Sequence, residues 1–159
     1  MQTEITSELL STPEGREADE ILRACVHCGF CTATCPTYQL LGDELDGPRG
    51  RIYQIKQVLE GREPTRITPI HLDRCLTCRS CETTCPSGVR YGRLVDIGRA
   101  LVDKKVSRPL GERMLRRAMV QILPHPERFG PLLSLGRLAK PVLPASLKAK
   151  VPSPRPAGK

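Results

Sequence analysis

The apolar positions of this chain recur at helical spacing and include no convincing strand. Between two glycines, apolar residues three or four positions apart predict a helix over residues 48–60. The same spacing predicts helices over residues 91–104 and 110–122, the second of which ends before Pro124. Later prolines interrupt the pattern, so the sequence indicates a mainly α protein.

Two further short helices are predicted, and each leads into a cysteine. After Pro13, acidic residues precede two apolar ones, an order that suits the positive end of a helix dipole and brings the chain to Cys25. Thr68 and Pro69 suit the N-cap and the first position of a helix that runs into Cys75.

All eight cysteines belong to two copies of one string, CxxCxxCxxxCP, fifty residues apart. Residues 22–36 align without gaps on residues 72–86 and match at seven of fifteen positions, five of which are the cysteines and the proline. The chain therefore repeats a site rather than a whole domain. The two copies comprise Cys25, Cys28, Cys31, Cys35 and Pro36, and Cys75, Cys78, Cys81, Cys85 and Pro86.

This string is the ligand run of bacterial two-cluster ferredoxins, in which three thiolates hold one [4Fe–4S] cluster and the fourth reaches the other. Cysteines three residues apart in a tight turn point their sulfurs into one small volume. The proline after the fourth cysteine steers the chain away, because its φ is fixed and it lacks an N–H. The predicted cofactors are two [4Fe–4S] clusters: cluster I on Cys25, Cys28, Cys31 and Cys85, and cluster II on Cys75, Cys78, Cys81 and Cys35, with Pro36 and Pro86 in support.

Three other uses of the cysteines fit less well. Zinc sites favour paired CxxC units separated by a longer loop, whereas here each group of four falls within eleven residues. Disulfides are disfavoured because the N-terminus shows no export signal. A thioredoxin-like dithiol would leave six cysteines unexplained.

Composition and charge set the limits of the remaining functions. With no Trp, two Phe and three Tyr, the organic core is thin, so the clusters are expected to supply part of it. Residues 1–50 carry a net charge of −6, residues 51–105 of +5 and residues 106–159 of +9. The basic last third has one aromatic residue for base stacking, which argues against nucleic acid as a partner. No apolar stretch is long enough to span a membrane, which leaves peripheral association.

These observations divide the chain into four parts. We expect a flexible lead-in over residues 1–13, a di-cluster domain over 14–106, a helical, proline-interrupted basic extension over 107–149 and a disordered tail over 150–159. The 39 residues between the two cysteine runs exceed what the compact ferredoxin fold uses. The predicted fold class is therefore an α-helical ferredoxin with cysteine loops at helix ends.

Residues 25–61 and 71–102 closely resemble the iron–sulfur subunit of glycolate dehydrogenase (glycolate oxidase), and the resemblance extends over about residues 15–151. It implies a non-catalytic subunit that takes electrons from flavin (FAD) subunits of the same complex and relays them towards a membrane quinone. The implied location is cytoplasmic, at the inner face of the membrane. Members of that family continue into cysteine-rich CCG segments, which this sequence lacks after Cys85.

The same eight cysteines occur in iron–sulfur subunits for glycerol-3-phosphate, lactate and heterodisulfide substrates, so the sequence leaves the substrate open. A regulatory cluster-binding module is the other functional class. No catalytic acid–base pair, nucleophile triad or phosphate loop is visible. The acidic residues 43–46 are interpreted as a solvated loop, and His27 is not expected to bind iron because four thiolates already fill each site.

The resemblance also places residues 47–51 as the GPRGR segment between the clusters. Positive charge near the ligands would favour a reduced, more negative cluster. The alternative is that these arginines are solvated or face an acidic partner. The arginines concerned are Arg49, Arg51, Arg74, Arg79 and Arg90. Phe30 and Leu76 are expected to shield the clusters from water.

Overall fold

The computed structural model of the chain describes residues 1–148 and 150–152, and every regular element in those residues is helical. The predicted mainly α class is confirmed. The chain divides into two compact units, Met1–Ser107 and Arg108–Lys159.

The first unit contains seven α-helices and two 3₁₀ turns. The predicted helices over 48–60 and 91–104 are present and differ from the prediction by one residue at their C-terminal ends. The elements are α1 (Ser7–Leu10), α2 (Pro13–Ala24), η1 (Phe30–Thr32), α3 (Pro36–Leu41), η2 (Glu44–Asp46), α4 (Pro48–Leu59), α5 (Thr68–Asp73), α6 (Ser80–Thr83) and α7 (Tyr91–Lys105).

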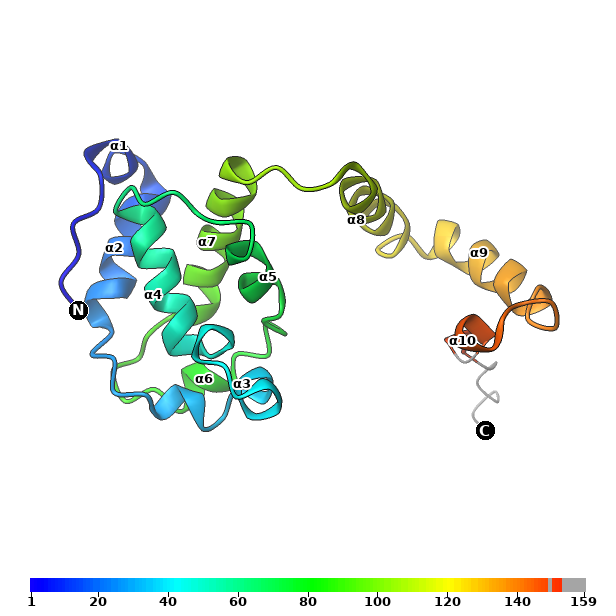
Figure 1. The fold of residues 1–159 in the computed structure, drawn as a ribbon, viewed down its shortest axis with the longest axis horizontal. Coiled ribbons are helices and arrows are strands. Elements are labelled where there is room, and N and C mark those ends of the chain that lie inside the picture. The colour runs from blue at the N-terminus through cyan, green and yellow to red at the C-terminus, as the bar shows by residue number, and fades with distance from the viewer. Residues whose placement is uncertain (149, 153–159) are drawn as a thin grey trace. The chain divides into compact units, whose positions relative to one another are not determined.

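Helices α2, α4 and α7 lie side by side and enclose the core (Figure 1). Their inward positions are apolar at helical spacing, and Leu22, Ile55 and Leu94 are almost completely buried. Helices α4 and α7 approach closely at Gly98, where a Cβ atom would lie 2.6 Å from Cγ1 of Ile55. A glycine at that position therefore permits the close packing of the two helices.

Residues 1–13, predicted as a flexible lead-in, contain α1 and make defined contacts with the rest of the first unit. The amino group of Met1 donates a hydrogen bond to the Cys25 carbonyl at 2.7 Å. Ile5 is buried in the core, and the Thr6 amide donates to the Leu59 carbonyl at 3.2 Å.

The second unit contains α8 (Leu110–Ile122), α9 (Pro126–Leu138) and α10 (Ala145–Lys148). Helix α8 has the predicted bounds, whereas α9 continues through Pro131 in a region where the sequence predicts interruption. No side chain of α8 or α9, both described throughout, is buried. Residues 153–159 of the predicted disordered tail lie outside the described residues. Within the described residues, no helix is long and apolar enough to cross a membrane.

Candidate metal centres

The two cysteine loops lie at one end of the α2–α4–α7 core (Figure 1). Cys25 directly follows α2, Cys35 is the N-cap residue of α3, and Cys81 lies within α6. Pro36 is the first residue of α3, whereas the corresponding Pro86 begins a turn in which the Gly88 amide donates to the Cys85 carbonyl. The loops are therefore held by helix ends, as the sequence predicts.

The cysteines line two open hollows. Hollow 1, of about 440 Å³, is lined by Cys25, Cys28, Cys31, Cys81 and Cys85. Hollow 2, of about 290 Å³, is lined by Cys35, Cys75, Cys78 and Cys81. None of the eight forms a disulfide. Each hollow thus contains one complete predicted ligand set, drawn from both loops, and Cys81 lies on the wall that the two hollows share.

The thiols influence one another's pKa values within each ligand set and, at Cys81, between the two sets. Burial raises the pKa of Cys31, and the nearby thiolates of Cys25, Cys28 and Cys85 raise it further. Burial raises the pKa of Cys81 to about 12, with further contributions from Cys75, from Cys31 of the other set and from Cys35. Metal ligation requires thiolates, so binding at these sites would release protons. The donor chemistry fits [4Fe–4S] clusters, and the assignment of each cysteine to a cluster remains a prediction.

The two loops share an unusual backbone conformation that the sequence alone did not indicate. His27 and Gly29 in the first loop have φ values of 57° and 87°, and the aligned Thr77 and Arg79 have 56° and 58°. Left-handed conformations are unfavourable for residues other than glycine, and here they recur at matched positions. Left-handed residues are a feature of concave backbone anion sites, in which successive N–H groups turn inward.

Two helix N-termini also face the hollows. Pro48, the first residue of α4, and Tyr91, the first residue of α7, line both hollows. A helix N-terminus carries partial positive charge and therefore stabilises a nearby anion. A [4Fe–4S] cluster with four thiolates is an anion, so the ends of both helices suit the predicted cofactors.

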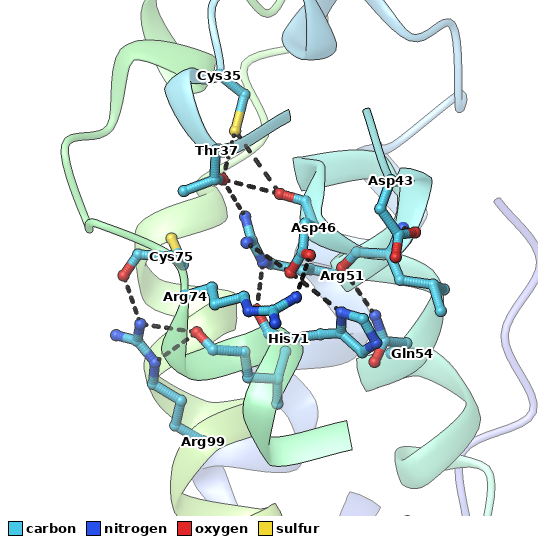
Figure 2. Close-up of polar contacts among 12 residues, drawn as sticks. Cys35, Thr37, Asp43, Asp46, Arg51, Gln54, His71, Arg74, Cys75 and Arg99 are labelled. Carbon is cyan, nitrogen blue, oxygen red and sulfur yellow. Dashed lines mark hydrogen bonds and ion pairs between the residues drawn. The ribbon is translucent and has the colours of Figure 1, made fainter. Parts of the chain in front are cut away.

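Thr37 and Arg51, which line hollow 2, belong to a buried polar network. Figure 2 shows the contacts of this network. Asp46 and Arg51 are fully buried, and their closest approach is 3.5 Å. His71 Nδ1 lies 3.0 Å from Asp46 Oδ1, and Arg74 donates to Asp46 Oδ2 at 2.7 Å. Burial alone would raise the pKa of Asp46, but the His71 and Arg74 contacts hold that pKa below its ordinary value. The sequence interpretation of residues 43–46 as a solvated loop is therefore wrong for Asp46.

Other side chains contact the predicted ligands of cluster II directly. Thr37 Oγ1 lies 3.2 Å from Cys35 Sγ. The Tyr91 hydroxyl donates to Cys75 Sγ at 3.6 Å, and burial raises the pKa of Tyr91, as does the Cys75 thiolate, so the hydroxyl keeps its proton. Arg99 donates to the Cys75 carbonyl at 2.7 Å and fixes the loop from α7 (Figure 2).

Hollow 1 is lined by a cation that is more exposed than Arg51 and by a histidine with one unpartnered ring nitrogen. The Arg49 side chain is 37% exposed and pairs with Glu44 at 2.9 Å. His27 lines the hollow, and its Nε2 is buried without a hydrogen-bond partner in the described part of the chain. Burial lowers the pKa of His27, and the charge of Arg49 lowers it further. A buried polar atom without a partner is consistent with a site that receives a further group.

The remaining arginines of the predicted set take different positions. Arg79 lines hollow 2. Arg74 forms an ion pair with Asp46, and Arg90 forms one with Glu17 at 3.4 Å. Phe30 and Leu76 line hollows 1 and 2 and are 62% and 66% exposed, so they cover the rims only in part.

Comparison with known proteins agrees with this geometry. Residues 21–89 match the 4Fe-4S dicluster domain family, which confirms two [4Fe–4S] clusters and a helical dicluster ferredoxin fold. The chain is 64% identical to the glycolate oxidase iron–sulfur subunit of Escherichia coli over 96% of its own length and 38% of that protein. It is 41% identical to a probable glycolate oxidase iron–sulfur subunit of Bacillus subtilis, over 77% of this chain and 28% of the relative.

A more distant relative is the succinate dehydrogenase iron–sulfur subunit of Paracoccus denitrificans, 30% identical over 58% of this chain and 39% of the relative. The chain thus spans well under half the length of each of these three relatives. No solved structure matches it.

Proposed function

We propose that this chain, which carries a 4Fe-4S dicluster domain and resembles glycolate oxidase iron–sulfur subunits along most of its length, is the electron-transfer subunit of a flavin-linked glycolate dehydrogenase. The observation that carries the proposal is the pair of cysteine-lined hollows with a common wall. When bound, each [4Fe–4S] cluster accepts and releases one electron, so a pair can receive the two electrons of a flavin singly.

The residues divide the remaining work among them. We propose that Cys25, Cys28, Cys31 and Cys85 hold cluster I, and that Cys75, Cys78, Cys81 and Cys35 hold cluster II. The left-handed loop residues orient backbone N–H groups, and the shared wall at Cys81 keeps the two sites adjacent. We further propose flavin (FAD) subunits as donors and a membrane quinone as acceptor, on the cytoplasmic face, where cysteines stay reduced and can serve as cluster ligands.

The cofactor proposal is tested by anaerobic iron and sulfide analysis followed by low-temperature EPR of the reduced protein. About eight iron and eight sulfide per chain and a spin-coupled signal are expected for two clusters. Zinc without sulfide would contradict the proposal. Anaerobic addition of flavin-bearing glycolate dehydrogenase subunits and glycolate should then bleach the visible absorption of the clusters. If glycolate and the flavin subunits leave that absorption unchanged but dithionite bleaches it, the proposed glycolate role is wrong and the proposed electron-carrier role stands.

The exchange of the fourth ligand between the loops is tested by pairs of serine variants. If the loops exchange it, Cys85→Ser alters the same EPR signal as Cys28→Ser, and Cys35→Ser alters the same signal as Cys78→Ser. If each loop holds its own cluster, the pairing is reversed, with Cys85 following Cys78.

A further inference from the structure

Arg51 is a buried cation that lines hollow 2 without a full counter-charge nearby. Its side chain is 1% exposed. Nε donates to the His71 carbonyl at 2.7 Å, and one terminal nitrogen donates to Thr37 Oγ1 at 3.1 Å, so both acceptors are neutral. Its approach to the Asp46 carboxylate, at 3.5 Å, is at the outer limit of a hydrogen bond.

Asp46 is shared with stronger partners. Arg74 reaches its Oδ2 at 2.7 Å, and His71 Nδ1 lies 3.0 Å from its Oδ1 (Figure 2). Two guanidinium groups and one carboxylate leave this network with net positive charge, whatever the protonation of His71. A buried charge is costly unless it is paired or bound to a metal centre. The anionic group that hollow 2 is built to hold supplies the missing counter-charge.

The corresponding cation at hollow 1 is weaker. Arg49 and Arg51 lie two residues apart at the start of α4, and each lines one hollow. The Arg49 side chain is 37% exposed, and its salt bridge to Glu44 at 2.9 Å offsets its charge. Water and a paired carboxylate both weaken the field of a charge, whereas burial strengthens it. Hollow 2 also receives the Tyr91 hydroxyl, which donates to Cys75 Sγ.

We propose that Arg51 and Tyr91 raise the reduction potential of cluster II above that of cluster I. The inference rests on the proposed function, since it uses the ligand sets stated there. Adding one electron changes the charge of a cluster with its four thiolates from roughly −2 to −3, and neither a bond nor a proton moves. The fixed charge of Arg51 and the hydroxyl of Tyr91 stabilise the more negative form, so the first electron given to the protein resides beside Arg51.

The test is an anaerobic redox titration of the full chain with dithionite and mediators, in which EPR follows each cluster. The signal of cluster II is assigned as the one that Cys78→Ser alters. Arg51→Gln should lower the potential of that cluster by at least a tenfold change in the one-electron equilibrium, which is 59 mV. The matched control Arg49→Gln removes the same charge two residues away. It should change the one-electron equilibrium of either cluster less than threefold. Arg51→Lys, which keeps the charge, should retain most of the wild-type potential.

Tyr91→Phe covers the case in which Arg51→Gln does not assemble cluster II. It keeps the ring and removes only the donor to Cys75, and it should lower the potential of cluster II by an amount that corresponds to about a threefold change in the one-electron equilibrium. The inference is overturned if cluster I has the higher potential in the wild type. It is also overturned if neither Arg51→Gln nor Tyr91→Phe changes the reduction potential of cluster II. If Arg51→Gln does not assemble cluster II, an unchanged potential in Tyr91→Phe alone overturns it. Wild-type protein with far fewer than about eight iron and eight sulfide would instead overturn the proposed function.

Discussion

The two units of this chain are both helical, and both carry apolar residues at helical spacing, but among the residues that the structure describes only those of the first unit are buried. In α7, Leu94 and Val95 are 0% exposed, whereas in α8, Leu110 and Met114 are each 73% exposed. Periodicity therefore predicts that a helix has an apolar face and does not predict what covers that face. In the first unit the cover comes from neighbouring helices and from the cysteine loops.

The largest contrast is expected when the clusters are removed. Two residues of the continuous apolar core of the first unit are cysteines, Cys25 and Cys81, and Cys31, Cys75 and Cys85 pack against it, so the ligand loops and the core are continuous. Small scaffolds of this kind depend on their metal centres for folding. We expect removal of iron by a chelator and an oxidant to abolish amide-exchange protection in α2, α4 and α7.

Amide exchange followed by mass spectrometry locates this loss along the chain. Helices α8 and α9 contain no buried side chain, and their protection is expected to remain unchanged. If α4 and α7 keep their protection without metal, the core of the first unit folds independently of the clusters.

The next largest effect is expected from Asp46→Asn. Removing this carboxylate leaves the buried Arg51 beside Arg74, whose side chain is 47% exposed. Breaking a fully buried ion pair costs about 3–5 kcal/mol, and because Arg74 is half exposed we expect a loss near the lower end, about 3 kcal/mol. The pKa of Asp46 is held below its ordinary value, so its contribution is present at neutral pH and is lost as the pH falls through that lowered value. Anaerobic urea unfolding, followed by circular dichroism, measures the difference.

Glu44→Gln is the matched control for Asp46→Asn, because the ion pair of Glu44 with Arg49 is exposed and should contribute less than about 1 kcal/mol. Equal losses from the two variants would show that burial of the network does not matter to stability.

Much of this architecture could be predicted from the sequence, for identifiable reasons. The cysteine spacing is set by the cluster, and the helix bounds at Pro48 and Tyr91 follow from proline and from apolar spacing. The burial of Asp46 could not be predicted, because its partners His71 and Arg74 lie 25 and 28 residues away. A charged residue in an acidic loop is usually solvated, and only the folded chain shows this exception.

The left-handed residues were also missed, since only Gly29 carries the expected signal and the aligned position in the second loop is Arg79. The helical fold of the described residues and the division of the cysteines into two sets were predictable, because each follows from a local pattern. The buried network depends on contacts between distant segments, which no local pattern encodes.

A smaller effect is expected from Gly98→Ala. The added Cβ would lie 2.6 Å from Cγ1 and 2.7 Å from Cδ1 of Ile55, in the packed contact between α4 and α7. Overpacking of this kind costs typically about 1–3 kcal/mol. The matched control is Gly111→Ala in α8, where nothing lies within 4 Å of the added atom, so helicity should be unchanged or rise. Urea unfolding of the first unit and the helical signal at low denaturant separate the two outcomes.

The smallest effect is expected from Leu115→Ala in α8. The Leu115 side chain is 60% exposed, so truncating it removes little buried area and should change the free energy of unfolding by less than about 0.5 kcal/mol. Leu94→Ala in α7 is the control, because that side chain is 0% exposed and its truncation should cost about 2–5 kcal/mol. A loss at Leu115 close to that at Leu94 would mean that the apolar face of α8 is covered in solution. Light scattering over a range of protein concentrations would then show whether a second copy of the chain covers this face. In that case the loss in the free energy of unfolding would also depend on protein concentration.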